Sequence, residues 1–175
     1  MRILPSRFKY SARRGFTLIE VLVVVVIVAI MSATVAISFN GGDRDRRLRA
    51  EAFRLAGLLE LTRNQAIQRN EEWGLFVDES TISFATFDET NREWVDWEQR
   101  PLKEFSLENI RLELSIDEQS QVPDSYATGD LPDLVFFSSG ESQKYDLRVQ
   151  PDWEAAAWTI SSDGLSSAAA VQEER

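Results

Sequence analysis

The feature that most constrains this chain is an apolar run near its amino terminus, from Phe16 to Phe39. Glu20 is the only ionisable side chain in the run. A helix of this length rises roughly 36 Å, which is enough to cross the hydrocarbon core of a bilayer. Its fifteen Leu, Ile, Val and Phe side chains favour insertion by roughly 4–9 kcal/mol, against roughly 3 kcal/mol for one buried charge. The run therefore predicts a transmembrane helix, which we place at residues 16–40.

The charges on either side of the run predict its orientation. The segment before Gly15 contains five basic residues and no acid: Arg2, Arg7, Lys9, Arg13 and Arg14. Basic flanks stay in the cytoplasm, so the rest of the chain is expected on the far side of the membrane. Without that segment the chain carries 14 Lys and Arg against 29 Asp and Glu. Such an acidic protein repels phosphate backbones, and we expect no nucleic acid partner.

Three ordinary export signals are alternatives for this segment. A cleavable secretory signal has an apolar core of about 7–15 residues, which is shorter than this run, and "SATVAIS" offers only a weak cleavage site. "SARRGF" is similar to a twin-arginine signal, but a charge at Glu20 inside the apolar core argues against it. A plain signal anchor fits the length of the run. It explains Glu20 only as a carboxylate that reaches back to the cytoplasmic interface.

A different interpretation accounts for the glutamate. "RRGFTLIEVLVVVVIVAI" resembles the processing and assembly motif of type IV pilins and type II secretion pseudopilins. The resemblance implies that a prepilin peptidase cleaves between Gly15 and Phe16 and methylates the new amino terminus of Phe16. It also implies that Glu20 pairs with the terminal ammonium of a neighbouring subunit in a filament. Two charges that are each costly in a low-dielectric bundle then largely neutralise each other.

A second helical segment follows at residues 43–70. One face carries apolar side chains at helical spacing, and arginines and glutamates lie elsewhere, which predicts an amphipathic helix packed on a globular domain. Asp43 is a candidate N-cap, and Gly41 with Gly42 predicts a flexible point between the two helical segments. The predicted apolar stripe consists of Leu48, Ala52, Leu55, Leu59, Ala66 and Ile67. The arginine group is expected to form a solvated face, or to contact lipid headgroups or adjacent subunits: Arg44, Arg46, Arg47 and Arg49.

Residues 71–175 are predicted to form a β-rich domain. Short β-prone runs alternate with turn-forming residues, and "NIRLELSI" alternates apolar and polar side chains most regularly. This pattern predicts antiparallel strands that bury one face. The expected strands are "WGLFV", "TISFATF", "EWVDW", "NIRLELSI", "DLVFF", "KYDLRVQ" and "AAWTIS", and the tail after Ser161 is expected to fray. The predicted fold is α+β, a long amino-terminal helix packed on two antiparallel sheets.

Two further stretches sharpen the resemblance. "EAFRLAGLLELTRNQAIQRNEEWGLFV" and "LVFFSSGESQKYDLRV" resemble the H-type minor pseudopilins of type II secretion, except that a proline is usual where Ser138 stands. The resemblance implies a leader peptide at residues 1–15 and a single-pass inner-membrane protein whose β-rich domain is periplasmic. It implies a subunit at or near the tip of the pseudopilus, which helps export folded proteins across the outer membrane. The expected partners are the major pseudopilin, other minor pseudopilins and the prepilin peptidase. A minor pilin of a type IV pilus, in filament priming or DNA uptake, is the alternative.

The residues give little support to an enzyme. Cysteine and histidine are absent, so the chain offers neither thiolate nor imidazole metal ligands and no base to activate Ser138 or Ser139. Neighbouring carboxylates such as Asp88 with Glu89 and Asp117 with Glu118 are expected on solvated faces in so acidic a chain. Trp94, Trp97, Trp153 and Trp158 could line a binding groove, but tryptophans at strand positions are expected in the core. We expect no cofactor.

Overall fold

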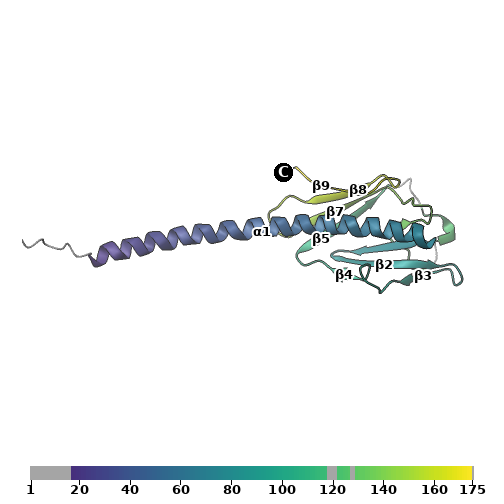
Figure 1. Ribbon diagram of the computed structural model, residues 1–175, viewed down its shortest axis with the longest axis horizontal. Coiled ribbons are helices and arrows are strands. Elements are labelled where there is room, and N and C mark those ends of the chain that lie inside the picture. Colours follow the sequence, from purple (N-terminus) through teal and green to yellow (C-terminus); the bar gives the residue numbers. More distant parts are fainter. Residues whose placement is uncertain (1–16, 118–121, 127–128, 175) are drawn as a thin grey trace, which may run out of the picture. The chain divides into compact units, whose positions relative to one another are not determined.

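The computed structural model (Figure 1) describes residues 17–117, 122–126 and 129–174, without the side chains of residues 32–41 and 124. One helix, α1, runs from Leu18 to Arg69. It therefore does not end at Gly41 and Gly42, and Asp43 lies inside it. The prediction that Asp43 caps a separate helix is wrong, because residues 40–42 are themselves helical.

The carboxyl end of α1 is set by its last residues. Asn70 follows the helix with a φ of 54°, a left-handed conformation that asparagine tolerates better than most residues. The Glu71 N–H then donates to the Ala66 carbonyl at 3.2 Å. This hydrogen bond satisfies a helix-end carbonyl and turns the chain into the first strand.

The chain divides into two compact units, Met1–Asp43 and Arg44–Arg175, and the second unit contains two antiparallel sheets. The first sheet has the order β3-β2-β1-β6, with β4 also paired to β2. The second has the order β5-β7-β8-β9. The strands are β1 (Trp73–Asp78), β2 (Thr81–Asp88), β3 (Glu93–Asp96), β4 (Phe105–Ser106), β5 (Ile110–Ile116), β6 (Leu134–Phe136), β7 (Tyr145–Pro151), β8 (Trp158–Ser162) and β9 (Ala169–Gln172). A short 3₁₀ helix, η1, spans Asp124–Tyr126.

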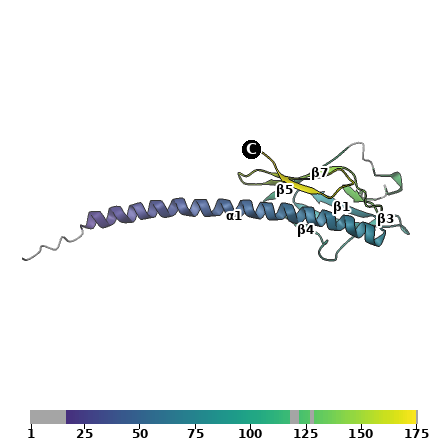
Figure 2. The ribbon, with the colours of Figure 1, turned by 45° about the horizontal axis from the view of Figure 1, so that its top comes forward.

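The carboxyl-terminal part of α1 and the inner faces of both sheets share one core (Figures 1 and 2). Five of the six predicted stripe residues are buried in it: Leu48, Ala52, Leu55, Leu59 and Ala66. Ile67 is the exception, with 47% of its surface exposed, because the last turn of the helix carries it toward the turn at Gly140 rather than between the sheets. The predicted α+β fold with two sheets is confirmed.

Every predicted strand exists, and the alternation of the strand from Ile110 is confirmed. Ile110 and Leu112 are buried whereas Arg111 and Glu113 are exposed, and Tyr145, Leu147 and Val149 repeat the pattern on β7. The two sheets also meet at their edges. The Leu112 N–H donates to the Glu79 carbonyl in the turn between β1 and β2. This hydrogen bond links β5 to the first sheet and leaves fewer unpaired backbone groups at the sheet edge.

The prediction that the tail after Ser161 frays is wrong. Strand β9 pairs with β8, with Val171 opposite Thr159 and Ala170 opposite Ile160. The next residue, Glu173, is held by Arg148 through two hydrogen bonds of 2.8 and 2.9 Å and by the Thr159 hydroxyl at 2.8 Å. Strand β9 is hard to predict from the sequence because "AAVQ" is short and lacks alternation.

Arg63 of α1 joins two distant turns of the second unit. Its guanidinium donates to the Gly140 carbonyl at 2.6 Å and to the Leu165 carbonyl. The same two turns are joined by the Ser142 N–H, which donates to the Gly164 carbonyl at 2.8 Å. Gly164 has a φ of 86°, and a Cβ there would collide with the Ser142 carbonyl oxygen. This position therefore requires glycine for both its conformation and its close contact.

We expect Gly164→Ala to lower the free energy of unfolding by roughly 1–3 kcal/mol, the usual cost of forcing a side chain into a strained backbone position. Urea unfolding of the detergent-solubilised protein, followed by tryptophan fluorescence, measures it. Gly57→Ala is the matched control, because Gly57 is helical and a Cβ there meets nothing within 4 Å. The free energy of unfolding of the control is expected to rise by about 0.5–1 kcal/mol, because alanine is favoured over glycine inside a helix. Equal unfolding midpoints for the two variants would contradict this assignment.

We also expect attachment of β9 to depend on pH. The hydrogen bond from Arg148, followed by that from Thr159, holds the pKa of Glu173 below its ordinary value. A carboxyl group with a lowered folded-state pKa contributes stability above its unfolded pKa of about 4.3, and that stability is lost as the pH falls through the folded value. Amide hydrogen exchange at Ala169–Gln172, corrected for intrinsic rates, should therefore accelerate as the pH falls below about 4.

At neutral pH, Glu173→Gln should accelerate exchange in β9 in the same way, because glutamine cannot form the charge-assisted pair with Arg148. Glu174→Gln is the control, since it removes one carboxylate from the neighbouring exposed position. Unchanged exchange in Glu173→Gln, or equal acceleration in both variants, would show that Glu173 does not hold the strand.

Candidate functional site

The candidate processing site lies at the start of α1. Gly15 and Phe16 are outside the described residues. Thr17 immediately precedes the helix, and its hydroxyl and carbonyl oxygens accept hydrogen bonds from the Glu20 N–H at 3.3 and 3.1 Å. Thr17 thus acts as an N-cap with a glutamate three residues later, the spacing of a capping box. The stretch "TLIE" carries this helix-start signal, which our sequence analysis did not use.

Glu20 is exposed, and its carboxylate has no ion-pair partner within the described part of the chain. Around it the helix is apolar on every side. The large apolar side chains from Leu18 to Met31 are between 48% and 85% exposed. A helix that is apolar all round is stable only when lipid or other protein covers it. Placed in such surroundings, a single carboxylate needs a cation beside it.

No helix among the residues described here is both long enough and apolar enough to span a membrane.

Part of the transmembrane helix predicted at residues 16–40 lies outside the described residues, namely Phe16 and the side chains of residues 32–40. That helix therefore stays a prediction.

The carboxylates considered as catalytic candidates serve local structure. Asp88 accepts hydrogen bonds from the Thr90 N–H and the Asn91 amide, both at 2.8 Å, in the turn between β2 and β3. These hydrogen bonds, the one from the Thr90 backbone first, lower its pKa. Asp117 lies 3.6 Å from the Lys144 ammonium, and Glu118 is outside the described residues. The two pairs therefore form no shared acid–base site in the described structure.

The serine-containing turn at residues 138–141 lies between β6 of the first sheet and β7 of the second. The Ser138 hydroxyl donates to Glu72 Oε1 at 3.0 Å, and Glu72 is only 6% exposed. Ser138 thus supplies a partner for a buried carboxylate, which a proline at this position could not do. Burial, and then the charge of Glu72, raises the pKa of Tyr126. Ser139 accepts from the Glu141 N–H at 3.4 Å and has no base beside it among the described residues.

The four tryptophans considered for a groove divide between core and surface. Trp158 is buried, as predicted, and packs against Phe53 at 5.5 Å between ring centroids. Trp94 and Trp97 are half-buried, and Trp97 lies under the Arg69 guanidinium at 4.7 Å. Trp153 is half-buried as well; like Trp97 it packs against the edge of the core, and it also lines a groove. It follows the end of β7, and its indole N–H reaches Asp45 Oδ1 of α1 at 3.4 Å.

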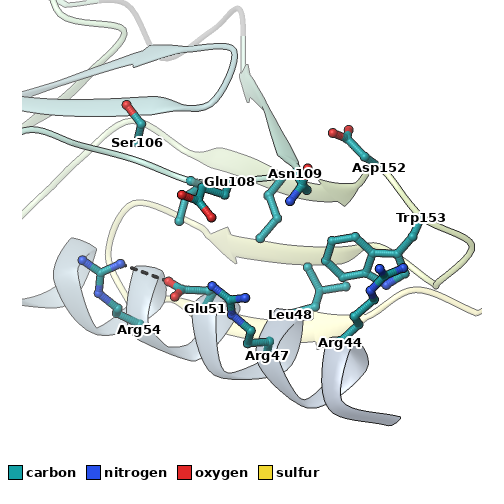
Figure 3. A pocket seen from close by; sticks show the side chains of 12 residues that line it. Arg44, Arg47, Leu48, Glu51, Arg54, Ser106, Glu108, Asn109, Asp152 and Trp153 are labelled. Carbon is teal, nitrogen blue, oxygen red and sulfur yellow. Dashed lines mark hydrogen bonds and ion pairs between the residues drawn. The ribbon is translucent and has the colours of Figure 1, made fainter. Parts of the chain in front are cut away.

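The groove beside Trp153 is the second candidate site, here named the arginine groove (Figure 3). It has a volume of about 470 Å³, with α1 on one side and the segments before β5 and after β7 on the other. Its charged and aromatic lining includes Arg44, Arg47, Glu51, Arg54, Glu108 and Trp153. Arg44 and Arg47 belong to the arginine group that the sequence places on a solvated face, and all four members of that group are exposed.

Sequence comparison with known proteins gives the family by two routes, a family model and a curated relative. The family model described as type II transport protein GspH matches residues 51–170, and that of the prokaryotic N-terminal methylation motif matches residues 10–36. Type II secretion system protein H of Pseudomonas aeruginosa is 32% identical over 160 residues, 88% of this chain and 93% of that protein.

Two solved structures of the minor pseudopilin EpsH from the type II secretion system of Vibrio cholerae share the fold. Their TM-scores are 0.58 and 0.59, at 16% and 18% sequence identity. The match covers 71% and 73% of this chain and 96% of each of those chains. The sequence matches and the shared two-sheet architecture agree, and this chain belongs to the GspH family of type II transport proteins, the H-type minor pseudopilins.

Proposed function

We propose that this chain is a minor pseudopilin of a type II secretion system, a non-catalytic subunit at or near the tip of the periplasmic pseudopilus. In this role it helps export folded proteins across the outer membrane. The observation that carries the proposal is the combination, in one chain, of the methylation motif at residues 10–36 with the GspH match at residues 51–170. Its partners are other minor pseudopilins and the major pseudopilin.

The amino terminus matures in the membrane under this proposal. A prepilin peptidase cleaves between Gly15 and Phe16 and methylates Phe16, so residues 1–15 are a cytoplasmic leader. Residues 16–40 form the inner-membrane and assembly helix, and residues 43–70 continue it as the segment packed on the β-rich domain of residues 71–175 in the periplasm. The exposed apolar surface from Leu18 to Met31 supports the membrane helix, because water is a poor solvent for it.

Glu20 has the assembly role. Cleavage leaves an ammonium on Phe16, four residues before Glu20, in a helix that is apolar on every side. A neighbouring subunit whose ammonium lies beside the carboxylate removes the cost of both charges. Only one axial offset between two helices brings the two groups together, so the pair sets the register while apolar packing supplies most of the association energy.

The proposal predicts the mass of the amino-terminal peptide. Protein recovered from cells that contain its prepilin peptidase should yield a peptide that begins at Phe16 and carries one added methyl group. Gly15→Val should abolish cleavage, since a branched side chain would obstruct the peptidase where glycine offers none. Mass spectrometry reads both results. An intact Met1 end in the unaltered protein would indicate a simple anchor and would exclude the filament role.

Glu20→Ala should leave membrane insertion and folding unchanged and weaken incorporation into the pseudopilus. The loss should be at least about tenfold in co-purified partner subunits, because an unpaired buried charge costs about 3–5 kcal/mol. Glu20→Gln should behave in the same way, whereas Glu20→Asp, which keeps the charge, should retain most of the interaction. Co-purification of Glu20→Ala at the unaltered level would refute the register role.

A further inference from the structure

The arginine groove has the features of a protein-docking site on the second unit of the chain. Small-molecule pockets of about 300–1,000 Å³ are lined mainly by apolar and aromatic side chains. This groove falls within that range, at about 470 Å³, but its lining is charged: three arginines and one carboxylate lie on its α1 side, two carboxylates lie across from them, and Trp153 lies near Arg44. Tryptophan and arginine, with tyrosine, are the residues most enriched at the hot spots of protein–protein interfaces.

Both walls of the groove are held in place before any partner binds. The Asp152 N–H donates to the Asn109 carbonyl at 3.0 Å, which fixes the end of β7 against the start of β5. The Leu107 N–H donates to the Ser80 carbonyl at 2.8 Å. The Trp153 indole N–H reaches Asp45 Oδ1 on α1 at 3.4 Å. A preformed groove binds a partner without the entropic cost of ordering its walls.

The arginines of the groove differ in what they already contact. Arg54 donates to Glu51 at 3.0 Å and lies over the Phe105 ring at 4.3 Å. Arg44 and Arg47 are exposed, and neither has an ion-pair partner in the part of the chain that the structure describes. They are three residues apart in α1 and therefore neighbours on one face of the helix. The groove thus offers two adjacent guanidinium groups to a carboxylate ligand.

The charge distribution of the second unit favours an acidic partner. Residues 44–54 carry five arginines against two acids, whereas residues 55–175 carry nine Lys and Arg against 25 acids. An acidic surface of a neighbouring subunit, of the kind that this chain itself presents, is attracted to the arginine segment and repelled by the rest. An anionic membrane fits less well, because Glu108 and Asp152 across the groove would repel a uniformly negative surface.

We propose that the arginine groove docks a carboxylate-bearing segment of a neighbouring pseudopilus subunit, with Arg44 and Arg47 pairing with its acidic side chains and Trp153 packing against its apolar part. The inference rests on the proposed filament function. It assigns to the body of the subunit a second contact, separate from the pairing at Glu20, that selects which neighbour lies beside this chain. Its specificity comes from the pattern of positive and negative groups rather than from net charge.

The test compares two double charge reversals in the full-length protein, expressed together with the other subunits of its secretion system. Arg44→Glu/Arg47→Glu reverses the two groove arginines. Arg46→Glu/Arg49→Glu makes the same change in charge on the same turns of α1, at exposed residues outside the groove lining. The groove variant should reduce co-purified partner subunits at least about tenfold, because like charges opposed across an interface cost several kcal/mol. The control should stay within about twofold of the unaltered protein.

Equal losses in the two variants would overturn the proposal in favour of general attraction to lipid headgroups, and no loss in either would overturn it as well. The unfolding midpoint of each variant shows whether it folds. If the groove variant does not fold, Arg44→Gln/Arg47→Gln takes its place. This variant adds no repulsion, so a smaller loss of co-purified partner subunits is expected. The amino-terminal peptide is measured in the same samples. A methylated peptide beginning at Phe16, together with partner binding unaffected by the groove variant, would reject the groove but leave the filament function standing.

Discussion

Burial of one stripe of α1 is the interaction on which the body of this protein depends. Leu48, Ala52, Leu55, Leu59 and Ala66 share a core with the inner faces of both sheets. Each sheet alone has a buried face that must be covered, and the helix stripe is the apolar surface common to the two. The small Ala52 and Ala66, both fully buried, leave room for larger strand side chains such as Trp73 and Phe84 to fill the same core.

At the start of the helix, by contrast, the apolar surface is not covered by the described part of the chain. From Leu18 to Met31 the apolar surface has no stripe, because every side of the helix is apolar and exposed. The same helix therefore carries two kinds of apolar surface, one satisfied inside the chain and one that needs lipid or other helices. Glu20 interrupts the second kind, and under the proposed function its charge gives association a defined register. This division suits the proposed subunit, which would be anchored in the membrane first and assembled later.

Charge also divides the surface of the second unit into two regions. Acids predominate from residue 55 onward, while residues 44–54 are basic. Within the second sheet, Arg148 lies between Glu113 and Glu173 and holds the terminal strand in place. Arg63 and Arg69 contact backbone carbonyls and aromatic rings, so these arginines stabilise the fold. Arg44 and Arg47 have no such contacts in the described part of the chain, which separates a binding surface from a structural one.

The sequence by itself determined the helix stripe, the seven main strands, the two-sheet α+β fold and the family, because each is written in local periodicity or in a contiguous motif. Four features depended on tertiary structure: the pairing of β9, the place of Ile67 outside the core, the partner of Ser138, and the groove beside Trp153. Each of these arises from residues far apart in the chain, as when Arg148 meets Glu173 or when Ser138 meets Glu72. Local sequence patterns do not predict such long-range contacts, since the contacts depend on how the helix and the two sheets pack around a common core.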